Sequence, residues 1–86
     1  MYKLELLKLK IPADIKGFEY LNAAIELYKP TASITGLYKT IADKYNDIPS
    51  RVERAMRHAI PKTNIKMTNG NFIATYKILW SKKEAV

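Results

Sequence analysis

The sequence predicts an all-α fold, a small helical bundle of about four to five helices that contains a helix-turn-helix. Two observations support this prediction. Apolar residues recur at intervals of three and four along most of the chain, and prolines and turn-forming residues separate the periodic segments. A chain of 86 residues with 48% hydrophobic residues is long enough for one small core and too apolar for a disordered segment. We therefore expect a single domain over residues 1–86.

Residues 34–60 carry the pattern of the helix-turn-helix. The apolar stripe of the first helix is expected to consist of Ile34, Leu37, Tyr38, Ile41, Ala42 and Tyr45. Asn46, Asp47 and Pro49 then favour a turn. We expect Ser50 to cap the second helix, because Glu53 three residues later completes an S-x-x-E capping box. The second helix is expected to bury Val52, Ala55, Met56, Ala59 and Ile60.

The first ten residues allow two interpretations. We favour a helix in which Leu4, Leu7 and Ile11 share one face. The alternation of Tyr2, Leu4 and Leu6 also fits an amphipathic strand or a partner-binding element. Pro12 ends this segment in either case.

A helix is predicted between Asp14, its expected N-cap, and about Lys29. Its core face is expected to contain Ile15, Phe18, Leu21, Ile25 and Tyr28. Pro30 closes this helix, and residues 31–33 supply a linker and the cap of the next one.

The segment after residue 60 is expected to hold a loop and a last helix. Pro61 terminates the preceding helix, and the Thr, Asn and Gly content of residues 62–71 predicts a polar connector. The last helix, over about residues 71–82, should place on one side Phe72, Ile73, Tyr76, Leu79 and Trp80. Lys82 and Lys83 in its last turn would interact favourably with the helix dipole.

The charge and the composition restrict the function. Fifteen Lys and Arg residues against eight Asp and Glu give a net charge of +7. Nucleic acid is the simplest acidic partner, although a membrane surface or an acidic protein would fit the charge equally well. No apolar run approaches the roughly 18 residues of a membrane span, and no signal-peptide core is present, so we expect a cytoplasmic protein without a membrane partner.

Catalysis and metal binding have little support in the sequence. The chain has no cysteine and a single histidine, which alone cannot build a zinc site. It also lacks a glycine-rich phosphate loop and an obvious nucleophile. We therefore expect no enzyme activity, no cofactor and no metal.

The face of the 50–60 helix opposite its apolar stripe is strongly basic. At about 100° per residue, this arc is expected to hold Ser50, Arg54 and Arg57 at its centre and Arg51, Glu53 and His58 on its flanks. An arginine fork can bond O6 and N7 of guanine, and a glutamate can accept from N4 of cytosine. A solvated face, in which Glu53 pairs with Arg57 at i, i+4, explains the same pattern about equally well.

Several segments together resemble the DNA-binding effector domain of the stage-zero sporulation protein A family. The proteins of this family are response regulators of endospore-forming bacteria. These segments are SRVERAMRHAI at 50–60, IPADIKGFEYLNAAIELY at 11–28, SIT, LY and IA in the helix before the turn, and N-x-x-FIA near the end. The resemblance covers about residues 11–76 and implies an all-helical domain whose 50–60 helix lies in the major groove. It also implies binding to boxes of the TGTCGAA type, usually as neighbouring copies.

The resemblance implies roles for individual residues of the 50–60 helix. Arg51, Glu53 and Arg54 are the implied base contacts. The implied contacts to bases or backbone are made by Ser50, Arg57 and His58. For the DNA backbone alone we expect Lys16, Lys39, Lys44 and Lys62, although lysines in a loop are more often only solvated.

The chain departs from the family in three respects. Nothing precedes Met1 that would form a receiver domain, and one residue is missing before the turn, where GLYKT replaces a longer segment. The connector before the last helix is also much shorter than in the family, which makes RNA polymerase contact doubtful.

Sequence-specific binding to double-stranded DNA is therefore the function that the sequence favours. The protein would act as a transcriptional regulator or as an accessory factor of a phage or mobile element, with homodimeric or tandem binding on DNA. The alternative is a protein-interaction module that docks its basic helix on an acidic regulator or polymerase subunit. RNA binding is disfavoured, because A-form RNA has a deep, narrow groove that excludes a helix.

Overall fold

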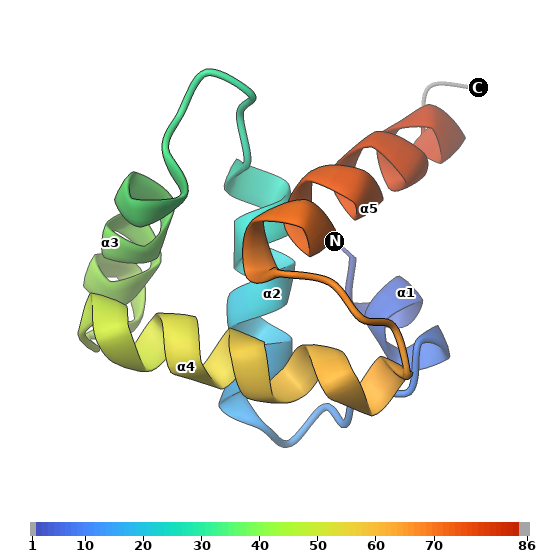
Figure 1. Cartoon of the computed structure of the whole chain (residues 1–86), viewed down its shortest axis with the longest axis horizontal. Helices are drawn as coiled ribbons and strands as arrows, with labels where there is room; N and C mark the ends of the chain where they lie inside the picture. Colours follow the sequence, from blue (N-terminus) through green and yellow to red (C-terminus); the bar gives the residue numbers. More distant parts are fainter. Residues whose placement is uncertain (1, 85–86) are drawn as a thin grey trace.

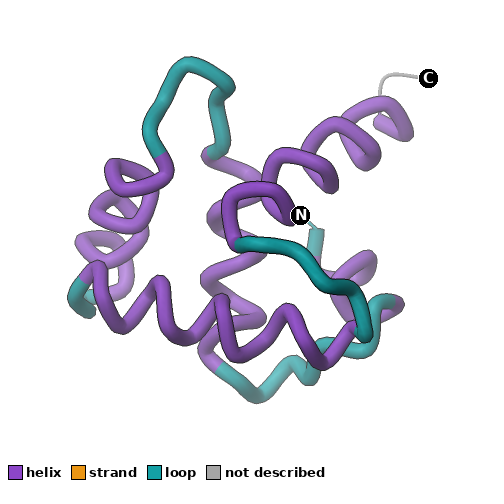
Figure 2. The backbone as a smooth tube through the Cα atoms, in the orientation of Figure 1, coloured by secondary structure: helices purple, strands orange, loops and turns teal. Residues whose placement is uncertain are grey.

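The computed structural model describes residues 2–84, and the side chains of residues 2–81. These residues form α1 (Lys3–Lys8), α2 (Lys16–Leu27), α3 (Ile34–Tyr45), α4 (Pro49–Ala59), a short 3-10 helix η1 (Ile60–Thr63) and α5 (Asn69–Glu84) (Figure 1). No strand occurs in the part of the chain that is described (Figure 2). The predicted all-α fold is confirmed, and the opening segment contributes a helix rather than a strand.

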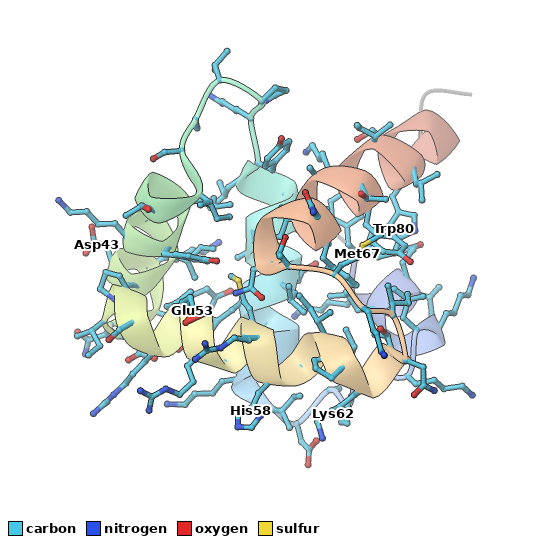
Figure 3. The ribbon with its side chains drawn as sticks, in the orientation of Figure 1. Asp43, Glu53, His58, Lys62, Met67 and Trp80 are labelled. Atoms are coloured by element: carbon cyan, nitrogen blue, oxygen red, sulfur yellow. The ribbon has the colours of Figure 1, made fainter. Side chains whose placement is uncertain are left out.

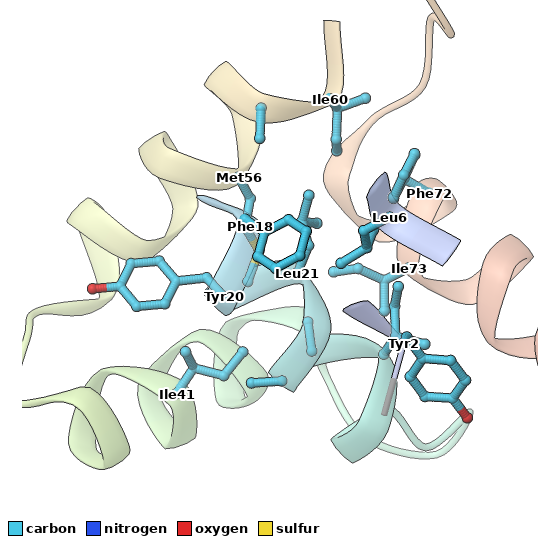
Figure 4. Close-up of a cluster of buried hydrophobic side chains, with 14 of the residues drawn as sticks. Tyr2, Leu6, Phe18, Tyr20, Leu21, Ile41, Met56, Ile60, Phe72 and Ile73 are labelled. Carbon is cyan, nitrogen blue, oxygen red and sulfur yellow. The ribbon is translucent and has the colours of Figure 1, made fainter. Parts of the chain in front are cut away.

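Helix α2 lies at the centre of the fold and contacts α1, α3, α4 and α5 (Figure 1). Its residues Phe18, Leu21 and Ile25 are buried, as their spacing predicts. Around them pack buried side chains from every other helix, including Leu6, Ile41, Met56, Ile60, Phe72 and Ile73 (Figure 4). Because α2 contacts the four other α-helices, it fixes the place of α4 relative to the rest of the core.

Helices α2 and α4 approach each other very closely at Gly17. A Cβ atom at this position would lie 2.5 Å from the carbonyl oxygen of Ala55 and 2.7 Å from the Cβ of Ala59. Only glycine on α2, opposite alanines on α4, permits this separation between the two backbones. The small residues at the crossing therefore set the distance between α4 and α2.

The buried face of α1 differs from the prediction. Leu4 and Leu7 are 61% and 46% exposed, whereas Tyr2 and Leu6 are buried. The ring of Tyr2 stacks on Trp80 at 5.7 Å between centroids, and Leu6 lies in the core. In a helix of six residues, the contacts with α2 and α5 decide which side is buried, and here they select the i, i+4 pair of Tyr2 and Leu6. Ile11 is buried as predicted.

Two predicted helix caps are wrong. Helix α2 begins after Ile15, whose backbone is extended, and Asp14 does not cap it. Helix α4 begins at Pro49, with Ile48 as N-cap and no side-chain cap, so Ser50 lies inside the first turn. Proline suits this position because it has no N–H to satisfy and its φ is already helical.

The predicted cap and end of α3 are confirmed, whereas Pro49, expected in the turn, is the first residue of α4, and Ile60, expected in the same helix, begins η1. The Oγ of Ser33 accepts a hydrogen bond of 3.0 Å from the N–H of Gly36 and caps α3. Asn46 ends α3 in the left-handed conformation, and the N–H of Asp47 then donates to the carbonyl of Ala42. Two helices joined by a tight turn therefore stand where the sequence predicts them.

The end of the chain follows the prediction with different boundaries. The chain continues past Pro61 in η1, so the loop shrinks to residues 64–68 and α5 begins at Asn69. Phe72, Ile73 and Trp80 are buried, but Leu79 is 52% exposed, contrary to the prediction. The side chains of Lys82 and Lys83 lie outside the described residues. Among the helices described, none is both long and apolar enough to cross a membrane.

Candidate nucleic-acid interface

Helix α4 has one buried face and one cationic face. Val52, Met56 and Ala59 are completely buried, and Ala55 is partly buried at the crossing with α2. The residues exposed on the other side are Ser50, Arg51, Arg54, Arg57 and His58. This division agrees with the predicted arc, and Figure 3 shows long nitrogen-tipped side chains projecting from this helix away from the core.

Ion pairs engage two of the three arginines. Arg57 Nε lies 3.3 Å from Glu53 Oε2, the pairing expected for a solvated face. Arg51 Nη1 lies 3.9 Å from Asp47 Oδ1. Arg54 forms no ion pair with any described side chain. Because both paired guanidinium groups are about two-thirds exposed or more, each ion pair is weak and leaves other N–H groups of the arginine accessible to a ligand.

Cationic side chains from α2 and η1 extend the basic face of α4. Lys16, His58 and Lys62 border one hollow of about 330 Å³, whose floor includes Gly17 and Ala55. In Figure 3, His58 and Lys62 point to the same side of the molecule. The structure therefore brings together three residues that are distant in the sequence or lie on different elements. A hollow with this lining suits an anionic group such as a phosphate.

The two lysines predicted on α3 are not brought together. Lys39 and Lys44 are both exposed, but five residues separate them, which places them about 140° apart around the helix axis. The Nζ of Lys44 lies 5.7 Å from the centroid of the Tyr45 ring. A ligand on one flank of α3 would contact only one of these lysines directly.

A partly buried hydrogen bond between α2 and the turn fixes the turn before α4. The hydroxyl of Tyr20, on α2, donates to Asp47 Oδ2 at 2.5 Å, and the N–H of Ile48 donates to Asp47 Oδ1 at 2.9 Å. Burial, together with the hydrogen bond to Asp47, raises the pKa of Tyr20 to about 12. The same hydrogen bond from Tyr20 lowers the pKa of Asp47. Helix α2 thereby holds the turn from which α4 starts.

A second hydrogen-bond network holds the opposite flank of α4. Asn69 is 8% exposed, and its Nδ2 donates to the hydroxyl of Tyr38 at 3.1 Å and to the backbone carbonyl of Glu53 at 3.0 Å. Burial raises the pKa of Tyr38. One buried amide thus connects the start of α5 with α3 and α4.

The two networks were not predicted. Tyr20 fits an apolar face, and Asp47 is explained by the turn alone, so their pairing has no signal in the local pattern. The spacing of Asp47 and Arg51, at i, i+4, is the one cue to the ion pair. Asn69 belongs to the N-x-x-FIA segment of the resemblance, but its hydrogen bonds reach residues 16 and 31 positions away.

The family comparison agrees with this arrangement. The model of the family described as "Sporulation initiation factor Spo0A C terminal" matches residues 3–81. The matched region contains every residue predicted to contact DNA. Domains of this family are the DNA-binding part of a sporulation response regulator, so the predicted resemblance is confirmed, and so is DNA as the partner.

Proposed function

The chain belongs to the family of Spo0A C-terminal domains, and we propose that it binds double-stranded DNA sequence-specifically with helix α4 in the major groove. One observation carries this proposal. The exposed face of α4 presents three arginines, while Val52, Met56 and Ala59 on its opposite face are completely buried in the core. The major groove of B-DNA is wide enough for such a helix, and its base edges carry a distinct pattern for each base pair.

Arg51, Glu53 and Arg54 are the proposed base contacts. Arg54 lies near the middle of the exposed arc and has no competing ion pair among the described residues, so its fork can bond a guanine. Glu53 lies on the flank toward α3, one-third exposed, and pairs with Arg57. On DNA, its carboxylate would exchange that arginine for a cytosine amino group, and Arg57 would be released toward the backbone.

The remaining polar and basic residues are proposed to position the domain on the duplex. Ser50, Arg57 and His58 lie on the same exposed face and contact bases or phosphates. Lys16 and Lys62 act with His58 at the hollow between α2 and α4, where a phosphate fits. Lys39 and Lys44, on different flanks of α3, complete the proposed set. Each phosphate that is neutralised should steepen the salt dependence by about one unit of slope.

The biological role that we propose is that of a transcriptional regulator or of an accessory DNA-binding factor from a phage or mobile element. Residues 1–86 would then form one helix-turn-helix domain, with α3, the turn and α4 as the motif. A single module of this size buries only about 600–1,000 Å² on DNA, so we propose that two copies occupy neighbouring boxes to bind tightly.

Selection of binding sites from random duplexes, at two salt concentrations, tests the proposal. We expect a TGTCGAA-like box to be recovered. Arg54→Ala should flatten the preference among sequences, because it removes about 1–3 kcal/mol of discrimination from one guanine. Lys62→Ala is the matched control on the same surface and should weaken all duplexes alike, with a salt slope smaller by about one.

Three outcomes would count against this function. Salt-sensitive binding without a motif would reduce the protein to a nonspecific DNA-binding protein. Unchanged duplex binding by both variants would show that α4 does not face the DNA. Capture of an acidic regulator or polymerase subunit that random duplex does not displace would favour a protein-interaction module.

A further inference from the structure

We infer that Asp47, fixed by Tyr20, is a positioning residue that orients Arg51 and so sets the base preference at the position that Arg51 contacts. This inference rests on the proposed role of α4. It concerns Asp47 and Tyr20, neither of which has been given a part in DNA recognition above. It assigns to Tyr20, which lies on another helix and does not face the groove, an effect on sequence specificity.

The first step is the rigidity of the carboxylate. The side chain of Asp47 is only 6% exposed, and both of its oxygens are engaged. Oδ2 accepts from the hydroxyl of Tyr20, and Oδ1 accepts from the N–H of Ile48. A carboxylate with one partner on α2 and another in its own turn has very little freedom to rotate.

The second step is the position of Arg51 beside that carboxylate. Its Nη1 lies 3.9 Å from Asp47 Oδ1, while 71% of its side chain is exposed. A free arginine side chain carries about 2 kcal/mol of rotamer entropy, part of which is lost on binding a base. A fixed anion beside the guanidinium group reduces the number of orientations that the side chain adopts before DNA arrives. Arg51 therefore meets the groove partly preorganised.

The third step is the location of the network within the fold. Arg51, Asp47 and Tyr20 border one hollow of about 270 Å³ between α2 and the turn. The carboxylate of Glu19 also borders it, but Glu19 pairs with Lys3 at 3.2 Å. Asp47 is thus the only acid that the described residues place in an ion pair with Arg51.

The Arg57–Glu53 pair serves as the internal control. It has the same i, i+4 spacing and a shorter distance, 3.3 Å, but it lies on the other flank of α4 and has no contact with Tyr20. An effect of Tyr20 that is transmitted through Asp47 must therefore couple to Arg51 and not to Arg57. An effect on the seating of the whole helix would couple to both arginines.

A double-mutant cycle tests this difference. Tyr20→Phe, Arg51→Ala, Arg57→Ala and the two double variants with Tyr20→Phe are titrated with the selected duplex and with its complete set of single-base changes. We expect Tyr20→Phe to lower discrimination about two- to fivefold at one base pair, since an exposed ion pair such as Asp47–Arg51 contributes at most about 1 kcal/mol. It should have no further effect at that base pair once Arg51 is alanine, and its full effect once Arg57 is alanine.

Asp47→Asn provides a second variant. Asparagine keeps one acceptor oxygen for the Ile48 N–H, and its Nδ2 can donate to the hydroxyl of Tyr20 in place of the present bond. It loses the charge that faces Arg51, so it should lower discrimination at the same base pair. Thermal unfolding of each variant verifies that the compared proteins are folded.

The remaining outcomes overturn the inference in distinguishable ways. If Arg51→Ala flattens one position while Tyr20→Phe and Asp47→Asn leave it unchanged, the positioning role is wrong and the proposed function stands. If Tyr20→Phe flattens every position and couples equally to both arginines, Tyr20 only seats the helix. If the wild-type protein does not distinguish the duplexes, the proposed function and this inference both fail.

Discussion

Replacement of Gly17 by alanine should destabilise the protein, although the same change in most helices is stabilising. Alanine is favoured over glycine by about 1 kcal/mol inside a helix, because glycine loses more backbone entropy. At Gly17 the added methyl group would lie 2.5 Å from a backbone oxygen and 2.7 Å from the Cβ of Ala59. Neither atom belongs to a flexible side chain that could move away. Helices α2 and α4 must therefore separate.

The size of the effect follows from the contacts that this separation weakens. Overpacking of a closely packed core costs about 1–3 kcal/mol, which outweighs the gain in helix propensity. For a domain of this size, 1 kcal/mol corresponds to roughly 4–8 °C in Tm. After the helix-propensity gain of about 1 kcal/mol is subtracted, the net loss is up to about 2 kcal/mol, so we expect Gly17→Ala to lower Tm by up to roughly 16 °C. It should also weaken DNA binding, since α4 is displaced from its packing against α2.

Thermal unfolding followed by circular dichroism measures this change, and Gly70 supplies the matched control. Gly70 lies in the first turn of α5, and a Cβ at that position would have no neighbour within 4 Å. Gly70→Ala should leave Tm unchanged or raise it slightly. A Gly17→Ala protein that is at least as stable as the Gly70→Ala protein would refute the account of the α2–α4 crossing.

Two further predictions concern the caps and the buried tyrosine. Ser33→Ala should lower the free energy of unfolding by about 1 kcal/mol because it removes the cap of α3, whereas Ser50→Ala should change it by less than about 0.5 kcal/mol; an equal loss in both would contradict the assigned start of α4. The pKa of Tyr20 is raised from 10.0 to about 12, so its stabilising contribution is complete below pH 10 and is lost as the pH rises toward 12. The unfolding free energy of Tyr20→Phe, measured by denaturant titration between pH 9 and 12, should therefore fall less steeply than that of the wild type, and parallel curves would contradict this assignment.

The helices themselves could be predicted because each carries a periodic apolar stripe. The spacing of Leu37 and Ile41, or of Val52 and Met56, identifies the buried face without knowledge of its partner. In α1 this fails, because six residues provide one and a half turns and two alternative apolar faces. The packing of Tyr2 on Trp80, 78 positions away, decides between them, and no local pattern contains that information.

Caps were harder to predict than helices. Asp14 and Ser50 are of residue types that often cap helices, but a capping residue must also stand directly before the helix, in extended backbone conformation. In this fold Ile15 and Ile48 occupy those two positions. At Ser33 the residue type and the geometry coincide, and the prediction is confirmed.

The sequence predicts which residues lie on the exposed face of α4, but it does not predict the hydrogen bonds that hold this helix in place. The exposed arc of α4 follows from helical spacing alone, so Arg51, Arg54 and Arg57 could be identified from the sequence. The hydrogen bonds from Tyr20 to Asp47 and from Asn69 to Tyr38 join residues 27 and 31 positions apart. Such contacts depend on the tertiary arrangement, which the one-dimensional pattern does not specify.

The most direct test of the central claim replaces each guanine of the selected duplex, one at a time, by 7-deazaguanine. This base pairs normally but lacks N7, an acceptor that only the major groove exposes. If the arginines of α4 contact guanines there, the affinity should fall about three- to tenfold at each contacted guanine, and the fall should vanish at one of them in Arg54→Ala. Inosine, which lacks only the minor-groove amino group, should leave the affinity unchanged. Full affinity for every 7-deazaguanine duplex, with losses at inosine instead, would contradict the placement of α4 in the major groove.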